Sequence, residues 1–409
     1  MKILFITLYL PVPPQSGQDI RNLSIIQCLA EAGHQLDFAS FVHKGFSGDL
    51  HPLSSFCLSI ETLEKETTNL TQHADYLRRI ECLLRFKSYS VERFKSEEFQ
   101  QIIGLRLQLE KYDVIICDGI HALLNIPETD VPIVLNCHFF ENVVLEQYAR
   151  LERNVVEKLY ARMESRRMWL AERKGARRAA CAMVCSHVDG AVMRSFTQEL
   201  SIFVVPNVVD TDSILPAPPS DHGGSEPILL FHGQMDWYAN RDAVEYFVSD
   251  ILPLVRREYP KIKLTIAGRN PPAKFIDQFK SDTLIEFTGT VKDMRPYLAG
   301  ATLVVVPLRL GSGTRIKILE ACAAGRPVVS TSLGAEGLDL EDGNEIVLAD
   351  DPVNFAQSII SMLKAPPRRE AVGACARMAV VDRYSHATLG KSLHGLVSTH
   401  SSNKNLADR

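Results

Sequence analysis

The sequence lacks the features that mark several large classes of protein. It contains no stretch of 18 consecutive apolar residues, so no membrane-spanning helix is expected. It also lacks a strong charge of either sign. Its 45 basic and 49 acidic residues leave a net charge of −4, which argues against nucleic acid as the main partner. Its 46% of hydrophobic residues is too high for a disordered chain. A length of 409 residues therefore predicts a folded protein of two domains.

Metal ligands with zinc spacing are also scarce. The nine cysteines are odd in number and scattered, which is typical of reduced thiols in a cytoplasmic protein. Cys181, Cys185 and His187 have no second ligand pair nearby, and Asp210 and Asp212 lie among turn residues, so no metal site is predicted. The opening run MKILFITLYLPVPP is interpreted as a strand, because prolines follow it and it has no A-x-A cleavage site.

Short apolar runs alternate with helical stretches along the chain. The predicted strands are 3–10, 35–41, 113–117, 133–137, 183–186, 203–205, 228–232, 263–267, 285–287, 303–307, 327–331 and 345–348. Helices are predicted at 20–32, at 241–258 and from near Thr314. This alternation predicts an α/β fold of two Rossmann-like domains, each a doubly wound parallel sheet, facing each other across a cleft. The predicted boundaries are 1–210, a hinge linker at 211–227, 228–385, and a C-terminal helix and tail at 386–409.

Residues 307–331 contain the richest motif. A predicted strand is followed by a Gly-Ser-Gly-Thr loop at 311–314 and then by a helix. A glycine-rich turn at a helix N-terminus presents backbone N–H groups to an anion. Arg315 and Lys317 add two cations, and the carboxylate of Glu320 suits a ribose diol. Together these groups predict a site for a nucleotide-diphosphate sugar.

Several segments resemble the retaining GT-B glycosyltransferases of family 4, also called glycosyltransferase group 1, over Met1 to Tyr384. They are PVPPQSGQDIRN, IVLNCHFFEN, VVPNVVD, and FHGQMDWYANRDAVEYF together with GSGTRIKILEACAAGRPVVST. The pattern is most similar to members that act in bacterial surface-polysaccharide assembly. The resemblance implies a GT-B fold and retaining transfer of a sugar from a UDP- or GDP-sugar to a glycan or lipid-linked acceptor. It implies no metal or other cofactor.

The resemblance also implies roles for individual residues. His138 would contact the transferred sugar, and Arg315 and Lys317 would meet the pyrophosphate; these three are the predicted catalytic residues. The predicted donor-binding residues are Gly17, Gly233, Gly311, Ser312, Gly313, Thr314 and Glu320. The candidate acceptor or secondary residues are Ser16, Arg21, Glu141, Asn240 and Arg241.

The chain departs from the family pattern at several of these places. Ser312 stands where the first glutamate of the E-x7-E motif would fall. Gln234 and Asn240 stand where an Arg and a Lys are usual, and Gln18 replaces a second glycine in the first loop. We expect Arg315 and Lys317 to supply the missing positive charge, with Arg241 as an alternative source.

Two helical regions of the first domain, 76–95 and 150–178, are rich in Arg and Lys. They could meet anionic lipid headgroups or a lipid-pyrophosphate acceptor. The alternative is a solvated, salt-bridged helix face, which is favoured for the second region. The sequence thus predicts a cytoplasmic enzyme that could act peripherally at the inner face of the cell membrane.

Two other functions stay open. A sugar-nucleotide epimerase of the same fold would need acid and base carboxylates that converge on the sugar, and no such constellation is evident in the sequence. A catalytically silent scaffold that binds sugar nucleotides is kept open by Ser312, which replaces a glutamate.

Overall fold

The computed structural model describes residues 1–14, 16–46, 48–65, 72–216 and 226–393, which form two compact units. Unit 1 is Met1–Pro206 together with the chain from Leu389, and unit 2 is Asn207–Thr388. The boundary therefore follows Pro206 rather than position 210. In the described part of the predicted tail, 386–393, positions 386–388 belong to unit 2 and 389–393 to unit 1. Positions 217–225 of the predicted linker and 394–409 of the tail lie outside the described residues.

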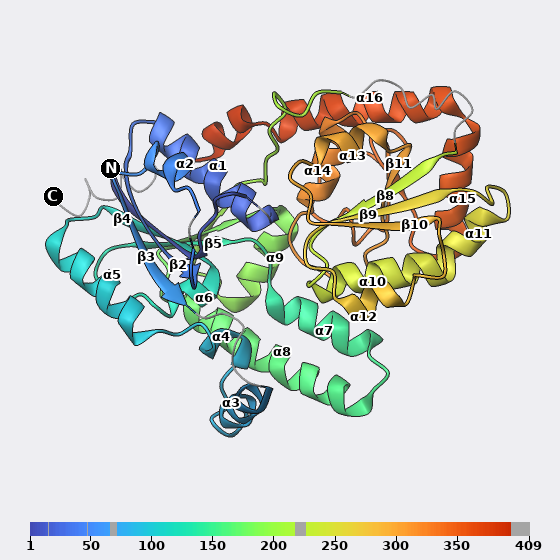
Figure 1. The fold of residues 1–409 in the computed structure, drawn as a ribbon. Coiled ribbons are helices and arrows are strands. Elements are labelled where there is room, and N and C mark those ends of the chain that lie inside the picture. The colour runs from blue at the N-terminus through green and yellow to red at the C-terminus, as the bar shows by residue number, and fades with distance from the viewer. Residues whose placement is uncertain (15, 47, 66–71, 217–225, 394–409) are drawn as a thin grey trace. The chain divides into compact units, whose positions relative to one another are not determined.

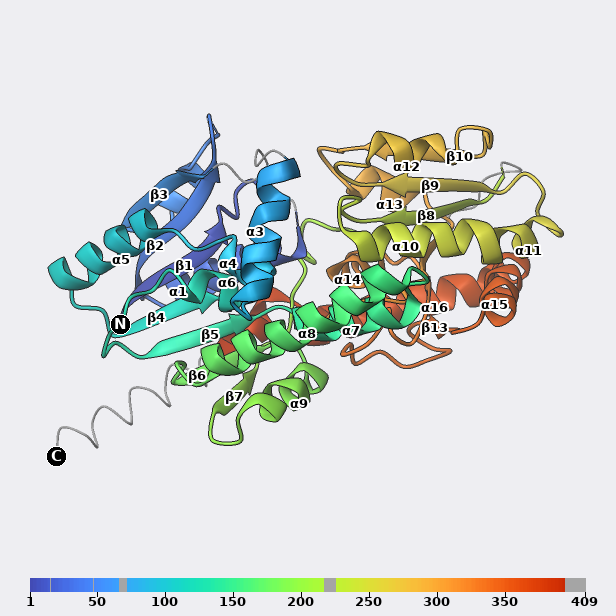
Figure 2. The ribbon, with the colours of Figure 1, turned by 90° about the horizontal axis from the view of Figure 1, so that it is seen from below.

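Unit 1 contains a sheet of seven parallel strands in the order β3-β2-β1-β4-β5-β6-β7, drawn from blue to green in Figures 1 and 2. The strands are β1 (Lys2–Tyr9), β2 (Gln35–His43), β3 (Ser59–Lys65), β4 (Val114–Asp118), β5 (Ile133–Cys137), β6 (Cys181–Val184) and β7 (Ser201–Val204). The helices are α1 (Gly17–Glu31), α2 (His51–Ser54), α3 (Gln72–Leu84), α4 (Tyr89–Glu92), α5 (Glu97–Leu109), α6 (Gly119–Leu123), α7 (Glu141–Leu151), α8 (Val155–Ala176) and α9 (His187–Phe196).

Unit 2 repeats this plan with six parallel strands in the order β10-β9-β8-β11-β12-β13. They are β8 (Ile228–His232), β9 (Lys263–Ala267), β10 (Ile285–Gly289), β11 (Leu303–Val306), β12 (Val328–Ser330) and β13 (Val347–Leu348). The helices are α10 (Tyr238–Tyr246), a π-helical turn (Phe247–Ile251), α11 (Leu252–Arg256), α12 (Ala273–Asp277), α13 (Arg295–Gly300), α14 (Ile316–Ala323), α15 (Pro352–Lys364) and α16 (Pro366–Arg383).

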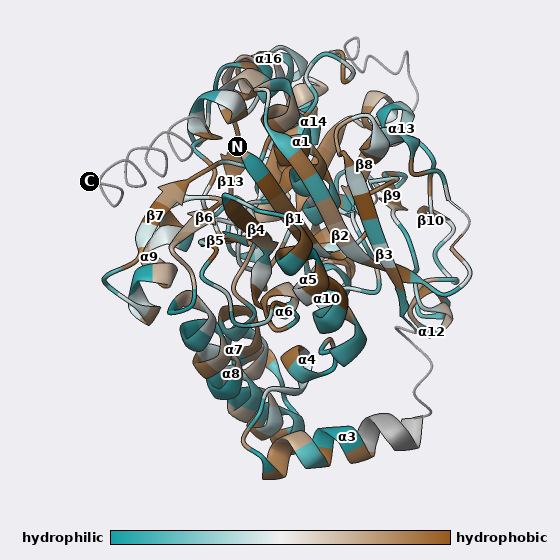
Figure 3. Ribbon diagram, turned by 90° about the vertical axis from the view of Figure 1, so that its left-hand side faces the viewer, coloured by the Kyte–Doolittle hydropathy of each residue, from teal (hydrophilic) through white to brown (hydrophobic). Residues whose placement is uncertain are grey.

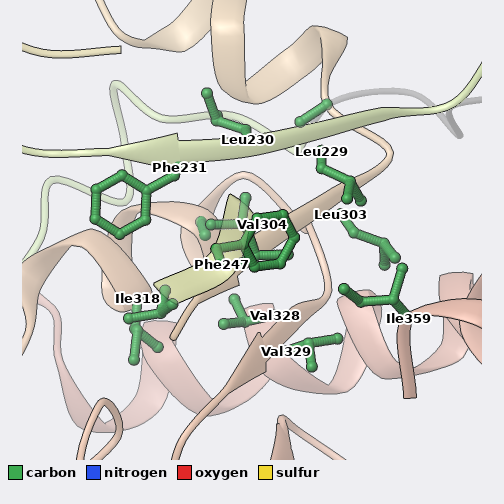
Figure 4. Packing of buried hydrophobic residues seen from close by; sticks show 14 of the residues in the cluster. Leu229, Leu230, Phe231, Phe247, Leu303, Val304, Ile318, Val328, Val329 and Ile359 are labelled. Atoms are coloured by element: carbon green, nitrogen blue, oxygen red, sulfur yellow. The ribbon is translucent and has the colours of Figure 1, made fainter. Parts of the chain in front are cut away.

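The strands form where the chain has continuous apolar runs. Every residue of β4, β5 and β11 is buried, as expected for parallel strands covered on both faces. In unit 2 the side chains of β8, β11 and β12 pack against Phe247, Ile318 and Ile359 from the surrounding helices (Figure 4). The predicted α/β class with two doubly wound sheets is confirmed.

The predicted elements differ from the observed ones in a few places. Strand β3 was not predicted, because SIETLEK alternates partly buried with exposed side chains at the sheet edge. The predicted helix at 241–258 is divided into α10, the π-helical turn and α11, with Pro253 in the first turn of α11. No helix among the described residues is long and apolar enough to cross a membrane.

In both sheets the strand order reverses once. The reversal lies between β1 and β4 in unit 1 and between β8 and β11 in unit 2. The loops that leave such neighbouring strands diverge to opposite faces, so open α/β sheets bind ligands at the carboxyl ends of these strands. The functional side chains of each unit are therefore expected to gather at its own switch point.

Candidate functional site

At the switch point of unit 2, two glycines make room for two cations. Gly233 follows β8 with φ +148°, and a side-chain carbon there would lie 2.7 Å from the Lys317 Nζ. Gly311 follows β11 with φ +150°, and a side-chain carbon there would overlap the Arg315 guanidinium. Both glycines thus adopt a backbone conformation that other residues rarely take, and both stand against a positive charge.

The Lys317 ammonium of α14 is held by residues of β8 and α10, on the other side of the switch point. Its Nζ donates a hydrogen bond of 2.8 Å to Asn240 Oδ1 and lies 4.4 Å from the centroid of the Phe231 ring. Asn240 Nδ2 in turn donates to the Gln234 carbonyl at 2.7 Å. Asn240 and Gln234 are the positions at which the family pattern has its cations. The structure therefore brings the Lys317 charge from the Gly-rich segment to this loop.

The electrostatics of this site are unfavourable for an isolated lysine. Removal from water, and then the charge of Arg315, lower the pKa of Lys317 to about 7, although Glu320 acts in the opposite direction. Arg315 is buried, and its guanidinium donates to the Leu333 carbonyl at 3.4 Å. Two cations held this close favour an anionic ligand, which would neutralise both.

Glu320 lies one turn beyond Lys317 on α14. Burial raises its pKa to about 7, and the charge of Lys317 limits the rise. His232, the last residue of β8, places its Nδ1 at 3.7 Å from Glu320 Oε2. Burial and the neighbouring Lys317 lower the pKa of His232 to about 3, so the imidazole is neutral and provides a polar neighbour without charge.

Two further residues fix the loops of this site. Asn207 Nδ2 donates to Thr314 Oγ1 at 2.7 Å, which ties the Gly-Ser-Gly-Thr loop to the first residue of the unit. Arg241 donates from one nitrogen to the carbonyls of Met235 and Asp236, at 2.9 and 2.7 Å. The guanidinium of Arg241 is thus engaged in holding the loop after β8, which does not favour it as the alternative phosphate cation.

The remaining donor-side predictions lie in the loop that precedes α14. Gly311 and Gly313 are buried, Ser312 and Thr314 are half-buried, and Gly313 has φ +76°. Helix α14 begins at Ile316 with Arg315 as its N-cap residue, so it starts two residues later than predicted from the sequence. The whole predicted donor set of unit 2 lies at one switch point. Gly17, the donor-side residue predicted in the first domain, lies in unit 1.

At the switch point of unit 1, the centre is a carboxylate that was not predicted from the sequence. Asp118, the last residue of β4, contacts His138 Nε2 through Oδ1. Its Oδ2 accepts hydrogen bonds from Gln18 Nε2 at 2.6 Å and from Asn22 Nδ2 at 2.8 Å, both on α1. Gln18, which stands where a second glycine is usual, therefore serves as a hydrogen-bond donor to this carboxylate.

A second layer of polar groups supports these contacts. Arg21, only 1% exposed, donates from Nε to Asn136 Oδ1 at 3.0 Å and from a terminal nitrogen to the Val205 carbonyl at 2.7 Å. Asn136 Nδ2 donates to Asn22 Oδ1 at 3.0 Å. Arg21 thus joins α1 to the carboxyl ends of β5 and β7. Arg21 therefore lies in the interior of unit 1, where its side chain positions Asn136 and the end of β7.

The ionisation of Asp118 defines what His138 can do. Burial would raise the pKa of Asp118, but the contacts with His138, Gln18 and Asn22 outweigh it and lower the pKa. An ionised carboxylate only accepts hydrogen bonds, so His138 Nε2 carries the hydrogen between them. The other ring nitrogen, Nδ1, is then the atom through which a neutral His138 could accept a hydrogen bond from a ligand.

The other first-domain candidates lie beside this network. Ser16 caps α1 by accepting a hydrogen bond from the Asp19 amide at 3.2 Å, and Gly17 is the first residue of that helix. Glu141 begins α7, and its Oε2 lies 3.1 Å from His121 Nε2. Burial opposes ionisation of Glu141, but the contact with His121 outweighs it and lowers the pKa. Behind it, Glu172 accepts from the Glu141 amide at 3.0 Å, and burial holds the pKa of Glu172 well above its usual range.

The residues missed from the sequence share one property. Asp118 and His232 are the last residues of the buried strands β4 and β8, and Asn136 lies near the end of β5. A polar residue that closes an otherwise apolar run is a signal that could have identified them, because ligands bind at the carboxyl ends of parallel strands.

Two groups of residues were considered as metal ligands and set aside: Cys181, Cys185 and His187, and Asp210 and Asp212. The described residues contain no cluster of three or more His, Cys, Asp or Glu side chains placed to hold a metal ion. Cys185 instead donates from its thiol to the carbonyls of Cys137 and His138, at 3.4 and 3.6 Å. Asp210 caps the turn that follows it by accepting from the Asp212 and Ser213 amides at 3.1 and 2.9 Å.

Two family descriptions match the chain. Residues 16–213 match "Glycosyltransferase Family 4", and residues 226–365 match "Glycosyl transferases group 1". The two matches follow one another along the chain and include the side chains described at both switch points. The chain belongs to the family 4, group 1 glycosyltransferases.

Known proteins of this family and fold resemble the chain over different lengths. A phosphatidyl-myo-inositol mannosyltransferase of Mycobacterium leprae is 29% identical over 203 residues, which are 48% of this chain and 53% of that protein. The chain spans between 37% and 55% of the length of the curated relatives that it matches.

Solved structures match the fold over almost the whole chain. Sucrose-phosphate synthase from Thermosynechococcus elongatus superposes with a TM-score of 0.76 at 17% identity, covering 98% of this chain and 100% of that chain. Anabaena HepE in complex with UDP and glucose gives 0.66 at 14% identity, covering 97% and 99%. At these identities the match shows the fold alone, which is the predicted GT-B fold.

Proposed function

We propose that this protein transfers a sugar from a nucleotide-diphosphate sugar to a glycan or lipid-linked acceptor, with retention of configuration. The observation that carries the proposal is the pairing of two cations with two glycines at the switch point of unit 2. Lys317 faces Gly233 and Arg315 faces Gly311, so backbone and positive charge are exposed to the same ligand position. A diphosphate matches this arrangement, because its charge would relieve the repulsion between the two cations.

The nucleotide diphosphate of the donor would be held by groups of unit 2. Lys317, Arg315 and the loop 311–314 would bind the diphosphate and stabilise the charge that develops as it leaves. Glu320 would accept hydrogen bonds from the ribose. HepE was crystallised in complex with UDP and glucose, and a mannosyltransferase relative from Corynebacterium glutamicum is named as GDP-mannose-dependent. These relatives favour a UDP- or GDP-sugar.

Unit 1 would serve the transferred sugar and the acceptor. We propose that His138 accepts a hydrogen bond through Nδ1 from the sugar or from the acceptor hydroxyl, with Asp118 holding the ring in place. Glu141 is the candidate for a second acceptor contact. The leaving diphosphate would take the acceptor proton on the same face of the sugar, so that neither a protein nucleophile nor a metal is needed.

The cellular setting belongs to the same proposal. Several relatives are named for transfer to phosphatidylinositol or its mannosides. An acceptor of this kind would place the protein in the cytoplasm at the inner face of an anionic membrane, as a peripheral partner.

The test begins with a panel of UDP-, GDP- and ADP-sugars in a thermal-shift screen, since ligand binding to the native state raises the midpoint. The best donor is then used to measure affinity for the wild type, Lys317→Ala and Arg315→Ala. Loss of a charged hydrogen bond of about 2 kcal/mol predicts roughly 30-fold weaker binding for each variant. Arg241→Ala tests the alternative cation, and Lys280→Ala is the control for an exposed lysine of unit 2.

Nucleotide release with and without glycan acceptors then separates the candidate functions. A transferase releases nucleotide faster with acceptor, and NMR of the product reports retention at the anomeric carbon. Isomerised donor without acceptor would identify an epimerase, and binding without turnover would identify a scaffold. Unchanged activity after EDTA treatment is expected. If Lys317→Ala and Arg315→Ala both bind the donor as wild type does, the proposed diphosphate site is wrong.

A further inference from the structure

Helix α8 of unit 1 has buried acidic residues and exposed apolar residues, the reverse of the usual arrangement on a surface helix. Its Glu164 and Glu172 are buried, while Val155 is 77%, Val156 76%, Leu159 59% and Leu170 55% exposed. The buried carboxylates have partners, because Glu164 accepts hydrogen bonds from the Ser88 hydroxyl and the Ser90 amide, and Glu172 accepts from the Glu141 amide. The helix is therefore fixed in this rotation, with its apolar side chains turned outward.

The other exposed residues of α8 are mostly basic. Eight residues of the helix are exposed: four are apolar, three are basic, and one, Glu157, is acidic. The outer α8 face, as we name it, consists of Val155, Val156, Leu159, Arg162, Arg166, Leu170 and Lys174. Apart from the neighbouring pair Val155 and Val156, its members follow one another at intervals of three or four residues, so they line one side of the helix. Figure 3 shows hydrophobic and hydrophilic segments succeeding one another along α8.

Helix α3 has a similar composition next to α8. Arg167 of α8 donates to the Leu83 carbonyl at 3.4 Å, so the end of α3 lies against the middle of α8. On α3, Leu77, Ile80 and Leu84 are exposed at 54%, 36% and 74%, spaced as one helical face. Arg85 follows directly and is exposed, and it pairs with Glu81 of α3 at 3.2 Å. Apolar and basic side chains therefore extend from α8 onto the neighbouring helix.

This combination restricts the partner. A face that presents valine and leucine beside arginine and lysine fits a partner with an apolar layer and anionic groups at the same depth. A second copy of the same face would bring like charges together. A bilayer with anionic headgroups satisfies both requirements, since the apolar side chains enter the acyl boundary while the basic ones remain among the phosphates.

We propose that the outer α8 face docks on the surface of an anionic lipid bilayer. The solvated face favoured from the sequence for region 150–178 does not account for four outward apolar side chains on a helix that buries two of its three acidic residues. The use of this docking, to bring the protein to a lipid-linked acceptor, rests on the proposed function, whereas the binding itself does not.

The experiment measures flotation of the full chain with lipid vesicles. We expect binding to vesicles of phosphatidylcholine mixed with phosphatidylglycerol, and none to phosphatidylcholine alone. Each basic residue at an anionic surface contributes on the order of fivefold, so Arg162→Gln with Arg166→Gln should weaken partitioning roughly 30-fold. Val155→Ser with Leu159→Ser should weaken it as well, and this loss should persist at high salt, where the charge contribution is screened.

Matched controls make the result specific. Lys261→Gln with Lys280→Gln removes the same charge from exposed positions of unit 2 and should leave flotation unchanged. Thermal midpoints of all variants should agree with the wild type, because the substituted side chains are exposed. The proposal is overturned if the wild type does not float with anionic vesicles, if the control weakens flotation as much as the α8 variants do, or if the wild type binds soluble polyglutamate but not vesicles.

The two proposals fail separately. The α8 variants should turn over donor with a soluble glycan acceptor as the wild type does. Flotation without any turnover would leave the docking face standing and remove the transferase proposal. Turnover without flotation would leave the transferase proposal standing and remove the proposed docking face.

Discussion

The two units share one topology but balance charge differently at their switch points. In unit 1 the buried Asp118 carboxylate is matched by His138, Gln18 and Asn22, and its pKa is lowered. In unit 2 the cations Lys317 and Arg315 lie close together, and the pKa of Lys317 is lowered to about 7 because its charged form is disfavoured. The charge of the first site is met by hydrogen-bond donors of the same unit, whereas the second has an excess of positive charge.

This difference indicates what each site is built for. Hydrogen bonds from several buried side chains hold the Asp118 carboxylate and its partners in one geometry, so unit 1 presents a fixed His138. A site with an excess of positive charge is less stable alone and gains most when an anion enters. Substitutions at the two switch points should therefore have opposite consequences, with stability lost in unit 1 and ligand affinity lost in unit 2.

The largest effect is expected for Asp118→Ala. It leaves the buried donors of Gln18, Asn22 and His138 without their acceptor, and each unsatisfied buried donor costs about 1–3 kcal/mol, so about 3–5 kcal/mol in total is expected. A loss of this size lowers the thermal midpoint by roughly 10 °C for a domain of this length. Asp118→Asn keeps the shape of the side chain, so its thermal midpoint should lie between those of Asp118→Ala and the wild type. Asp130→Ala removes an exposed aspartate of the same unit and should change the midpoint little. Equal midpoints for Asp118→Ala and wild type would contradict a network that depends on the Asp118 carboxylate.

Lys317→Met should show the reverse pattern. It removes a cation that burial and Arg315 disfavour, so we expect the free energy of unfolding to change by less than about 1 kcal/mol. Affinity for UDP should fall roughly 30-fold, since about 2 kcal/mol of charged hydrogen bonding is lost. Urea unfolding and calorimetric titration measure the two quantities on one preparation. A variant that loses stability but keeps UDP affinity would place Lys317 among structural residues.

The pH dependence of donor binding should reveal the same imbalance. Lys317 has a pKa of about 7 in the free protein, and a bound diphosphate would raise it. Binding then takes up a proton above pH 7, so affinity for UDP-glucose should fall as pH rises, by at most about tenfold per unit. Glu320, also near 7, acts in the opposite direction below that pH, because its protonated form accepts ribose hydrogen bonds less well.

Two comparisons separate these effects. For the 2′,3′-dideoxyribose analogue of UDP-glucose, the fall in affinity below pH 7 (the acid limb) should disappear, and the fall above pH 7 (the alkaline limb) should remain. Lys317→Met should lose the alkaline limb. An affinity that stays constant on both sides of neutrality for the wild type would exclude the proposed proton uptake.

The sequence allowed the fold and the site of unit 2 to be predicted better than the site of unit 1. Gly311, Arg315, Lys317 and Glu320 fall within ten residues, so a single motif contains their chemistry. The network of unit 1 joins Asp118 to Gln18, which lies 100 positions away, and only the sheet topology brings them together. The contact of Lys317 with Asn240, 77 positions apart, was equally hidden, although the compensating role of Lys317 was predicted.

The smallest expected effect concerns the tie between Asn207 and the Gly-rich loop. Asn207→Ala removes the hydrogen bond to Thr314 Oγ1, worth about 1 kcal/mol, and loosens the loop that would contact the diphosphate. Affinity for UDP should fall about fivefold, with a comparable loss of stability. Asn344→Ala, at an exposed asparagine of the same unit that donates to Glu341, is the control and should change neither quantity measurably. If Asn207→Ala lowered stability without affecting affinity, the loop would be ordered by other contacts. The donor affinity of unit 2 would then depend on Lys317 and Arg315 and not on this hydrogen bond.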